Sequence, residues 1–157
     1  MANLAPYLEQ DEVTLDSRKL TDPWSDWFQA LVDAVNAAPS TKGKAKLATQ
    51  AASIAATDLT DGAFPAGMYR VTYYARITQA ATTSSSLTVT IDWTDGAVGQ
   101  SQAGAAMTGN TTTTIQSGSV LLRSDKAKAI TYTTTYASVG ATVMQYSLDL
   151  TLERVAE

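Results

Sequence analysis

The feature of this sequence that most restricts its fold is a regular alternation of apolar and polar side chains in four separate stretches. Successive side chains of a β-strand point to opposite faces, so a period of two indicates strands that are buried on one side only. Antiparallel sheets with one wet face show this pattern, whereas the strands of buried parallel sheets are continuously apolar. The four stretches are residues 69–78, 87–94, 130–136 and 146–153.

Weaker strand-like stretches and turn signals fill the space between these four. The weaker stretches are residues 47–59, 102–107 and 113–123. Two Asp-Gly pairs mark turns, and 24 of the 157 residues are threonine, a residue that favours strands. Seven or eight short strands with this spacing predict a mostly β fold, an antiparallel β-sandwich of jelly-roll type over residues 47–157.

Residues 21–38 follow a different period and are predicted to form one short amphipathic helix. Asp22 suits the N-cap and Pro23 the first helical position, while Asn36 and Pro39 can end the helix. Apolar residues recur every three or four positions and so share one face. They are Trp24, Trp27, Phe28, Leu31, Val32 and Val35. Such a stripe is costly to leave in water, so we expect it to pack either on the sandwich or against other copies of the chain.

Two segments flank this helix. Residues 1–20 mix apolar and charged side chains, and we expect an N-terminal anchoring arm that becomes ordered on a neighbour, with a plain flexible terminus as the alternative. The contact residues expected in the arm are Leu4, Tyr7 and Leu8. Residues 39–46 contain three lysines, at positions 42, 44 and 46. They are predicted to form a solvated linker, with contact to an acidic partner as the alternative.

The composition removes several kinds of chemistry. The chain has no Cys and no His, which excludes thiolate nucleophiles and Cys-ligated metals and removes the commonest general base. A net charge of −4 disfavours general binding to nucleic acid. No stretch is apolar for long enough to span a membrane, and no phosphate-binding glycine motif occurs. We therefore expect no enzyme activity, no cofactor, no metal site, and neither nucleic acid nor membrane as a partner.

Carboxylates are the remaining candidates for chemistry. Asp58, Asp61, Asp92 and Asp95 fall at predicted turns and strand ends. A pair of them could serve a glycosidase, and turn oxygens could hold calcium. The simpler interpretation is that these residues fix turns or lie on the wet face of a strand.

One aromatic residue falls on the polar face of its strand. Tyr74 alternates with buried positions, and Arg70 and Arg76 share its side of the strand. Tyr and Arg are favoured at the centre of recognition surfaces. These three residues are therefore a possible ligand surface, and a carbohydrate- or host-receptor-binding module is the alternative function.

Several segments carry a resemblance to a known family. They are residues 68–78, 84–91, 93–96 and 133–140 in the strand zone, with 24–31 and 36–39 before it. Together they resemble a sandwich domain, preceded by a short helical segment, that recurs in small virion proteins and in tail or fibre proteins of tailed bacteriophages. The resemblance covers most of residues 21–155 and rests on packing and turn residues, so it implies an architecture and a setting more firmly than a binding specificity.

The resemblance implies a structural component of a phage virion, such as a head fibre, decoration protein or tail-fibre module. Members of the family are often homotrimers, so it also implies threefold assembly, with capsid, portal or tail proteins as further partners and a host surface glycan as a possible one. The implied location is the virion, assembled in the bacterial host cytoplasm. No catalytic motif of the family exists to transfer. Many relatives are longer fibres with several domains, whereas this sequence holds an arm, a helix and a sandwich.

Overall fold

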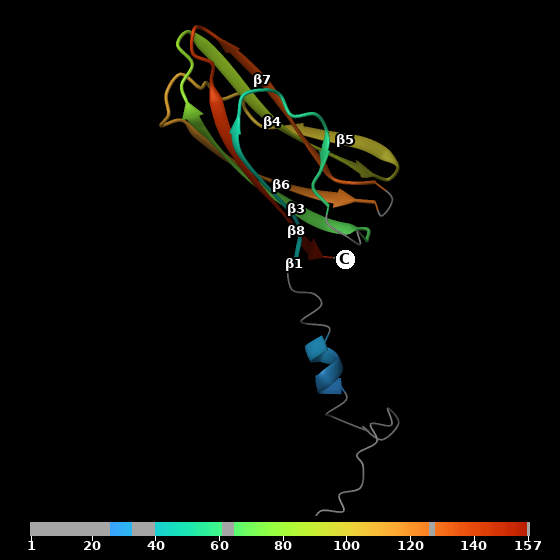
Figure 1. Ribbon diagram of the computed structural model, residues 1–157. Coiled ribbons are helices and arrows are strands. Elements are labelled where there is room, and N and C mark those ends of the chain that lie inside the picture. The colour runs from blue at the N-terminus through green and yellow to red at the C-terminus, as the bar shows by residue number, and fades with distance from the viewer. Residues whose placement is uncertain (1–25, 33–39, 61–64, 126–127, 157) are drawn as a thin grey trace, which may run out of the picture. The chain divides into compact units, whose positions relative to one another are not determined.

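The computed structural model describes residues 26–32, 40–60, 65–125 and 128–156 (Figure 1). The chain divides into two compact units, Met1–Ala37 and Ala38–Glu157. In the first unit, residues 26–32 are helical, which confirms the middle of the helix predicted over 21–38. The other predicted contact residues of this unit lie outside the described residues. They are Leu4, Tyr7, Leu8, Trp24 and Val35.

The described part of the second unit consists of eight strands in two sheets. The strands are β1 (Ser40–Gln50), β2 (Thr57–Asp58), β3 (Gly67–Gln79), β4 (Ser84–Asp95), β5 (Val98–Ala103), β6 (Ile115–Ser124), β7 (Thr131–Val139) and β8 (Gln145–Ala156). One sheet, here called sheet A, has the order β1-β8-β3-β6, and the other, sheet B, has the order β2-β7-β4-β5. All neighbouring strands in both sheets are antiparallel.

The strand pairing is that of a jelly roll. β1 pairs with β8, β2 with β7, β3 with β6 and β4 with β5, so the first half of the sandwich is wrapped against the second like one long folded hairpin. The β3–β8 and β4–β7 pairs then join these couples into two four-stranded sheets. This arrangement confirms the predicted antiparallel β-sandwich of jelly-roll type.

The core lies between the two sheets and is built by the alternating stretches. Their apolar residues are buried, while the residues between them face outward. The largest fully buried side chains include Tyr69, Ile77, Leu87, Ile91, Tyr146, Leu148 and Leu152. Thr134 is buried among them, and its hydroxyl lies 2.8 Å from the Tyr146 hydroxyl and accepts the N–H of Ile54, also at 2.8 Å. A buried polar group is tolerated when it is bonded in this way.

The predicted linker over residues 39–46 is wrong for residues 40–46, which form the first part of β1. Ala45 lies opposite Leu150 and Leu47 opposite Leu148, and both side chains pack against the core. The intervening Lys44 and Lys46 are exposed. The lysines therefore mark an edge strand with one wet face, where charged side chains are common, and the sandwich begins at Ser40 instead of residue 47.

The weaker predicted strands are confirmed unevenly. β6 matches the stretch predicted over 113–123, whereas β5 precedes most of the stretch predicted over 102–107. The stretch over 47–59 contains the end of β1 and the two-residue β2, separated by residues 51–56. Those residues are held by single bonds to β7, such as the Thr134 N–H to the Ile54 carbonyl at 3.1 Å, instead of by a continuous ladder.

Candidate functional site

The three predicted ligand residues lie on one strand and face outward from sheet A. Tyr74 of β3 is opposite Asp149 of β8 and Ser117 of β6, and Asp149 is in turn opposite Lys46 of β1. Residues directly opposite in neighbouring strands share a face of the sheet. Each strand of sheet A therefore contributes one side chain to the row that contains Tyr74.

The adjacent rows combine polar and charged side chains with the exposed Leu121 and Ile115 of β6. Thr72, next to Tyr74 along β3, lies between Thr151 and Ser119. On the far side of Thr72, the Arg70 Nη2 atom lies 2.7 Å from the Glu153 Oε2 atom in a surface ion pair. We call the outward side of sheet A, centred on Tyr74, the β3 face. The sequence pattern could place only its β3 residues, because the pairing of β3 with β1, β6 and β8 is set by the tertiary fold.

Among the described residues, Tyr74 is the aromatic residue on this face, and it is 40% exposed. Thr72, Ser117 and Ser119 beside it are short hydroxyl side chains, while Arg76 and the exposed Ile115 lie on its other side. The short neighbours leave room on their side of the ring for a flat ligand. Asp149 supplies an acceptor and Lys46 a donor at the same level, so the row combines an apolar surface with polar edges.

The β3 face carries more cations than carboxylates, although the whole chain has a net charge of −4. Its cations are Lys44, Lys46, Arg70, Arg76 and Arg123, and its carboxylates are Asp149 and Glu153. Charges of one sign gathered on one face attract ligands of the other sign. The positive patch is thus larger than the three-lysine cluster that the sequence indicated.

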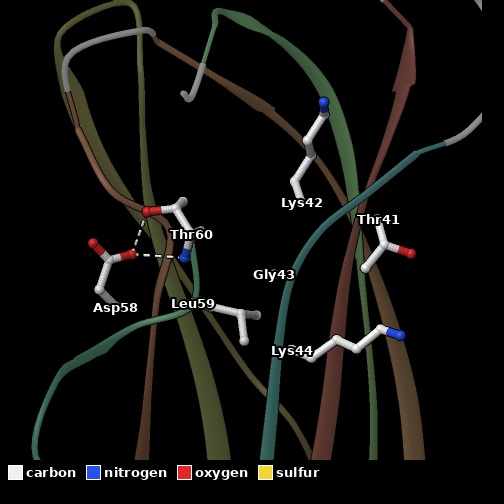
Figure 2. Close-up of a pocket in the computed structure, with 7 residues that line it drawn as sticks. All are labelled: Thr41, Lys42, Gly43, Lys44, Asp58, Leu59 and Thr60. Atoms are coloured by element: carbon white, nitrogen blue, oxygen red, sulfur yellow. Dashed lines mark hydrogen bonds between the residues drawn. The ribbon is translucent and has the colours of Figure 1, made fainter. Parts of the chain in front are cut away.

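A polar cavity of about 430 Å³ lies between β1 and the segment after β2 (Figure 2). Its side chains do not converge. The Lys42 and Lys44 side chains extend away from Asp58 and in different directions (Figure 2). The Asp58 carboxylate accepts the N–H of Thr60 at 2.7 Å, which is a local turn bond. This cavity therefore contains no arrangement of groups aimed at a common ligand.

Gly43 explains why β1 and this segment come so close. A Cβ atom added at Gly43 would lie 1.6 Å from the Leu59 carbonyl oxygen. The Leu59 N–H is fixed by a 2.9 Å bond to the Ile130 carbonyl, so the segment cannot retreat without loss. The close approach of β1 to Leu59 in the cavity wall thus requires glycine at position 43, which is a packing role.

The other carboxylates considered from the sequence have structural positions. Asp92 lies on the outward side of sheet B opposite Thr131, and Asp95 ends β4 opposite Val98. Asp61 lies outside the described residues. Among the described residues, no group of three or more carboxylates is placed to hold a metal ion. In the same part of the chain, no helix has the length and apolarity that a membrane span needs.

Three tyrosines have perturbed phenol groups inside the sandwich. Burial raises the pKa of Tyr69, Tyr73 and Tyr146 above the ordinary tyrosine value, and the neighbouring Arg154 partly offsets this for Tyr69. The Tyr69 hydroxyl donates to the Pro65 carbonyl at 2.6 Å, and the Tyr146 hydroxyl donates to the Ala52 carbonyl at 2.9 Å. These phenols hold loops against the core and stay neutral at physiological pH.

The described helix carries four of the predicted interface residues. Trp27, Phe28, Leu31 and Val32 are each roughly half exposed, between 44% and 52%. The rings of Trp27 and Phe28 meet edge to face, with centroids 5.1 Å apart. Among the described residues, the apolar side chains of the helix are thus only partly covered.

Comparisons with known proteins give similarity at the level of solved structures only. No protein-family model matches the chain, and no curated protein matches it. One similar structure is a family 16 carbohydrate-binding module-2, with 13% identity and a TM-score of 0.33, covering 73% of this chain and 73% of that one. Another contains the CBM22-1 and GH10 modules of the Clostridium thermocellum N-terminal endo-1,4-β-D-xylanase 10B complexed with xylohexaose. It has 14% identity and a TM-score of 0.35, and covers 72% of this chain and 26% of that one. Similarity this low carries no argument about ligand or activity.

Proposed function

We propose that this protein is a non-catalytic binding module whose β3 face takes a carbohydrate. The observation that carries the proposal is the position of Tyr74, 40% exposed on the outward side of sheet A and next to the short hydroxyl side chains of Thr72 and Ser117. A sugar ring has a flat side of C–H groups and a rim of hydroxyls. The tyrosine ring matches the first, while Asp149, Lys46 and Ser117 offer partners for the second.

The open shape of the β3 face suits an extended chain of sugars. Four strands contribute to its rows, and the polar residues continue on either side of Tyr74. A small ligand is usually enclosed in a cavity that buries most of its surface. A polysaccharide can instead lie along a sheet and make its contacts over several residues.

The test is binding to a panel of soluble polysaccharides by calorimetry, with three variants. We expect Tyr74→Ala to weaken binding at least about tenfold and Tyr74→Phe to retain most of it, because stacking uses the ring. Thr135→Ala, on the outward side of sheet B, is the control and leaves binding unchanged. Absence of binding to every polysaccharide, or equal binding by Tyr74→Ala, contradicts the proposal.

A second function concerns how this module is held. We propose that the first unit attaches the protein to a phage virion and gathers its copies into homotrimers. Support comes from the division into two units and from the exposed Trp27 and Phe28 on the helix. An amphipathic helix with large exposed apolar residues is the kind of element that packs against other helices.

This second proposal is tested by Trp27→Ser with Phe28→Ser, in particles and in isolation. The double variant is expected to lose both incorporation into particles and the trimer mass in light scattering, while the sandwich stays folded. Asp26→Ser, on the same helix, is the matched control. A wild-type monomer at tens of micromolar, or normal incorporation of the double variant, contradicts it.

A further inference from the structure

β6 is an edge strand with an open row of backbone groups. Within the described residues it pairs with β3 alone. The Thr114 carbonyl, just before β6, accepts the Ile77 N–H of β3 at 3.1 Å. Backbone groups of successive residues in a strand point to opposite sides, so even-numbered residues of β6 face β3. The N–H and C=O groups of residues 115, 117, 119, 121 and 123 therefore face away from the sheet.

A bond at the far end of β6 supports this assignment. Asp125 continues the odd-numbered series, and its N–H bonds to the Thr94 carbonyl at 2.9 Å, away from β3. Between these two ends, β6 and β3 match in ten consecutive residue pairs without a register shift. The open row is thus straight and regular along the length of the strand.

β6 lacks the features that usually keep an edge strand from pairing with another chain. Proteins protect edges with lysines, prolines, bulges or very short strands. β6 has ten residues and contains neither lysine nor proline. Its charged residue, Arg123, stands near the end, and its outward side chains include Ile115 and Leu121, which are 59% and 61% exposed.

We propose that two copies of this protein pair through β6, antiparallel and with a twofold axis at Gly118. In this register Ile115 lies opposite Leu121 of the second copy, and Ser117 lies opposite Ser119 of the second copy. Odd residues meet odd residues, as the open row requires. Apolar side chains meet apolar ones and hydroxyls meet hydroxyls on the outward side of the sheet.

Steric and charge considerations favour this register. Gly118 would lie opposite Gly118 of the second copy in a non-hydrogen-bonded pair, where Cα atoms approach to about 4.5 Å. Glycine has no side chain to obstruct this approach. Arg123 would lie opposite Thr113 of the second copy, so no like charges face each other. The equivalent pairing of two β1 edges would bring together strands that each carry three lysines. Charge thus directs self-association to β6.

The consequence of this pairing is a continuous eight-stranded sheet with two β3 faces on one side. The two Tyr74 residues would be three strand spacings apart, about 15 Å. The contact along one strand is smaller than the roughly 800 Å² per partner of a stable interface. We therefore expect a weak contact that dissociates in the micromolar range, that adds to any assembly through the first unit, and that links more copies as concentration rises. The pairing does not depend on what the β3 face binds.

The register is tested by disulfide formation, because the chain has no cysteine of its own. Full-length Ile115→Cys and Leu121→Cys proteins, one with a mass tag, are mixed and mildly oxidised. The mixture is expected to give a crosslinked pair of unequal masses. Either variant alone gives none, since identical positions would be six residues away, about 20 Å, beyond disulfide reach.

Val98→Cys mixed with Val139→Cys serves as the control, because both side chains are as exposed as Ile115 but lie on other strands. A mixed product no more abundant than this control overturns the proposal. So does equal crosslinking of either variant alone, because that would show a different register.

A second measurement removes one outward N–H. Ser119→Pro deletes a donor that faces the open edge and spares the bonds to β3, and proline is tolerated on an edge strand in this orientation. In the Trp27→Ser, Phe28→Ser form, assembly through the first unit is removed. In sedimentation of this form from about 1 to 200 μM, a range that brackets the expected dissociation constant, Ser119→Pro is expected to abolish the concentration-dependent association that the parent and Ser119→Ala show. Association that persists when folded Ser119→Pro is added to that form, or a parent form without association, overturns the proposal.

Discussion

The two edges of sheet A differ in almost every property that governs strand pairing. β1 carries Lys42, Lys44 and Lys46, has two register shifts against β8, and includes Thr49 at a positive φ of 56°. β6 is straight, pairs with β3 without a shift and has no lysine. Irregularity and charge make an edge unsuitable as a template. Within the described residues, one edge of this sheet is thus protected against pairing and the other is open to it.

The largest expected effect comes from disturbing the fit of the protected edge. In Gly43→Ala the new Cβ would overlap the Leu59 carbonyl, and backbone cannot move aside as a side chain can. We expect the free energy of unfolding to fall by about 3 kcal/mol. Urea denaturation with a tryptophan or circular dichroism signal measures this change.

Alanine substitutions at two other glycines provide the comparison for Gly43→Ala. Gly118→Ala on β6 would meet the Tyr73 ring at 2.4 Å, a side chain that can shift, so its loss is expected to be smaller. Gly99→Ala has open space around it and is expected to be nearly neutral. If Gly43→Ala proved no worse than Gly99→Ala, the close contact that shapes the β1 edge would be refuted.

The strained end of β1 offers a stabilising change. Thr49 is β-branched and occupies the left-handed region, which costs a non-glycine residue about 1–2 kcal/mol. Thr49→Gly is expected to raise the free energy of unfolding by about 1 kcal/mol. Thr133→Gly, in the regular register of β7 with β4, should lower it by about 0.5 kcal/mol, since glycine weakens a strand of ordinary geometry. Equal effects at the two positions would argue against strain at Thr49.

Alkaline pH is expected to destabilise the packing beneath β6 through Tyr73, whose ring lies next to Gly118. Its pKa is raised by burial, so the folded state keeps the phenol proton after the unfolded chain has lost it. The stabilisation from this group is complete below the ordinary tyrosine pKa of about 10 and is lost as pH rises through the raised value. Tyr73→Phe should therefore move the midpoint of alkaline unfolding to higher pH. An unchanged midpoint, with unchanged stability at pH 7, would contradict this account.

The smallest expected effect concerns the ion pair between β3 and β8. Arg70 and Glu153 are 2.7 Å apart, but their side chains are 44% and 30% exposed, so water screens the pair. Arg70→Gln is expected to cost about 0.5 kcal/mol or less, and the loss should vanish at high salt. A double-mutant cycle with Glu153→Gln measures it. A coupling above about 1.5 kcal/mol would show that the pair is better shielded than its exposure indicates.

The strands that sequence predicted best are those with one wet and one dry face. Tyr69, Val71 and Tyr73 alternate with polar residues, and the structure buries all three. The first half of β1 was not predicted as a strand, because its inward residue Ala45 is only weakly apolar and the three lysines made the segment look like a solvated linker. A period-two pattern identifies a strand only when the inward residues are clearly apolar and the outward residues are clearly polar.

The candidate site, too, was predicted only in part from the sequence. Alternation placed Tyr74, Arg70 and Arg76 on one side of one strand. It could not add Asp149 or Lys46, because which distant strands become neighbours, and in what register, follows from the whole jelly roll. The residues 1–20 and both ends of the predicted helix lie outside the described residues, so their predicted contacts stay predictions.

The position of β1 has a mechanical consequence. β1 begins three residues after the first unit ends, so a pull on that unit along the strand is transmitted first to the β1–β8 ladder. Its bonds lie across the strand axis, and eight residue pairs would share the tension in shear instead of opening one by one. β8 passes the load directly to β3, the strand that bears Tyr74. A force applied between the first unit and Tyr74 would thus be carried mainly along sheet A.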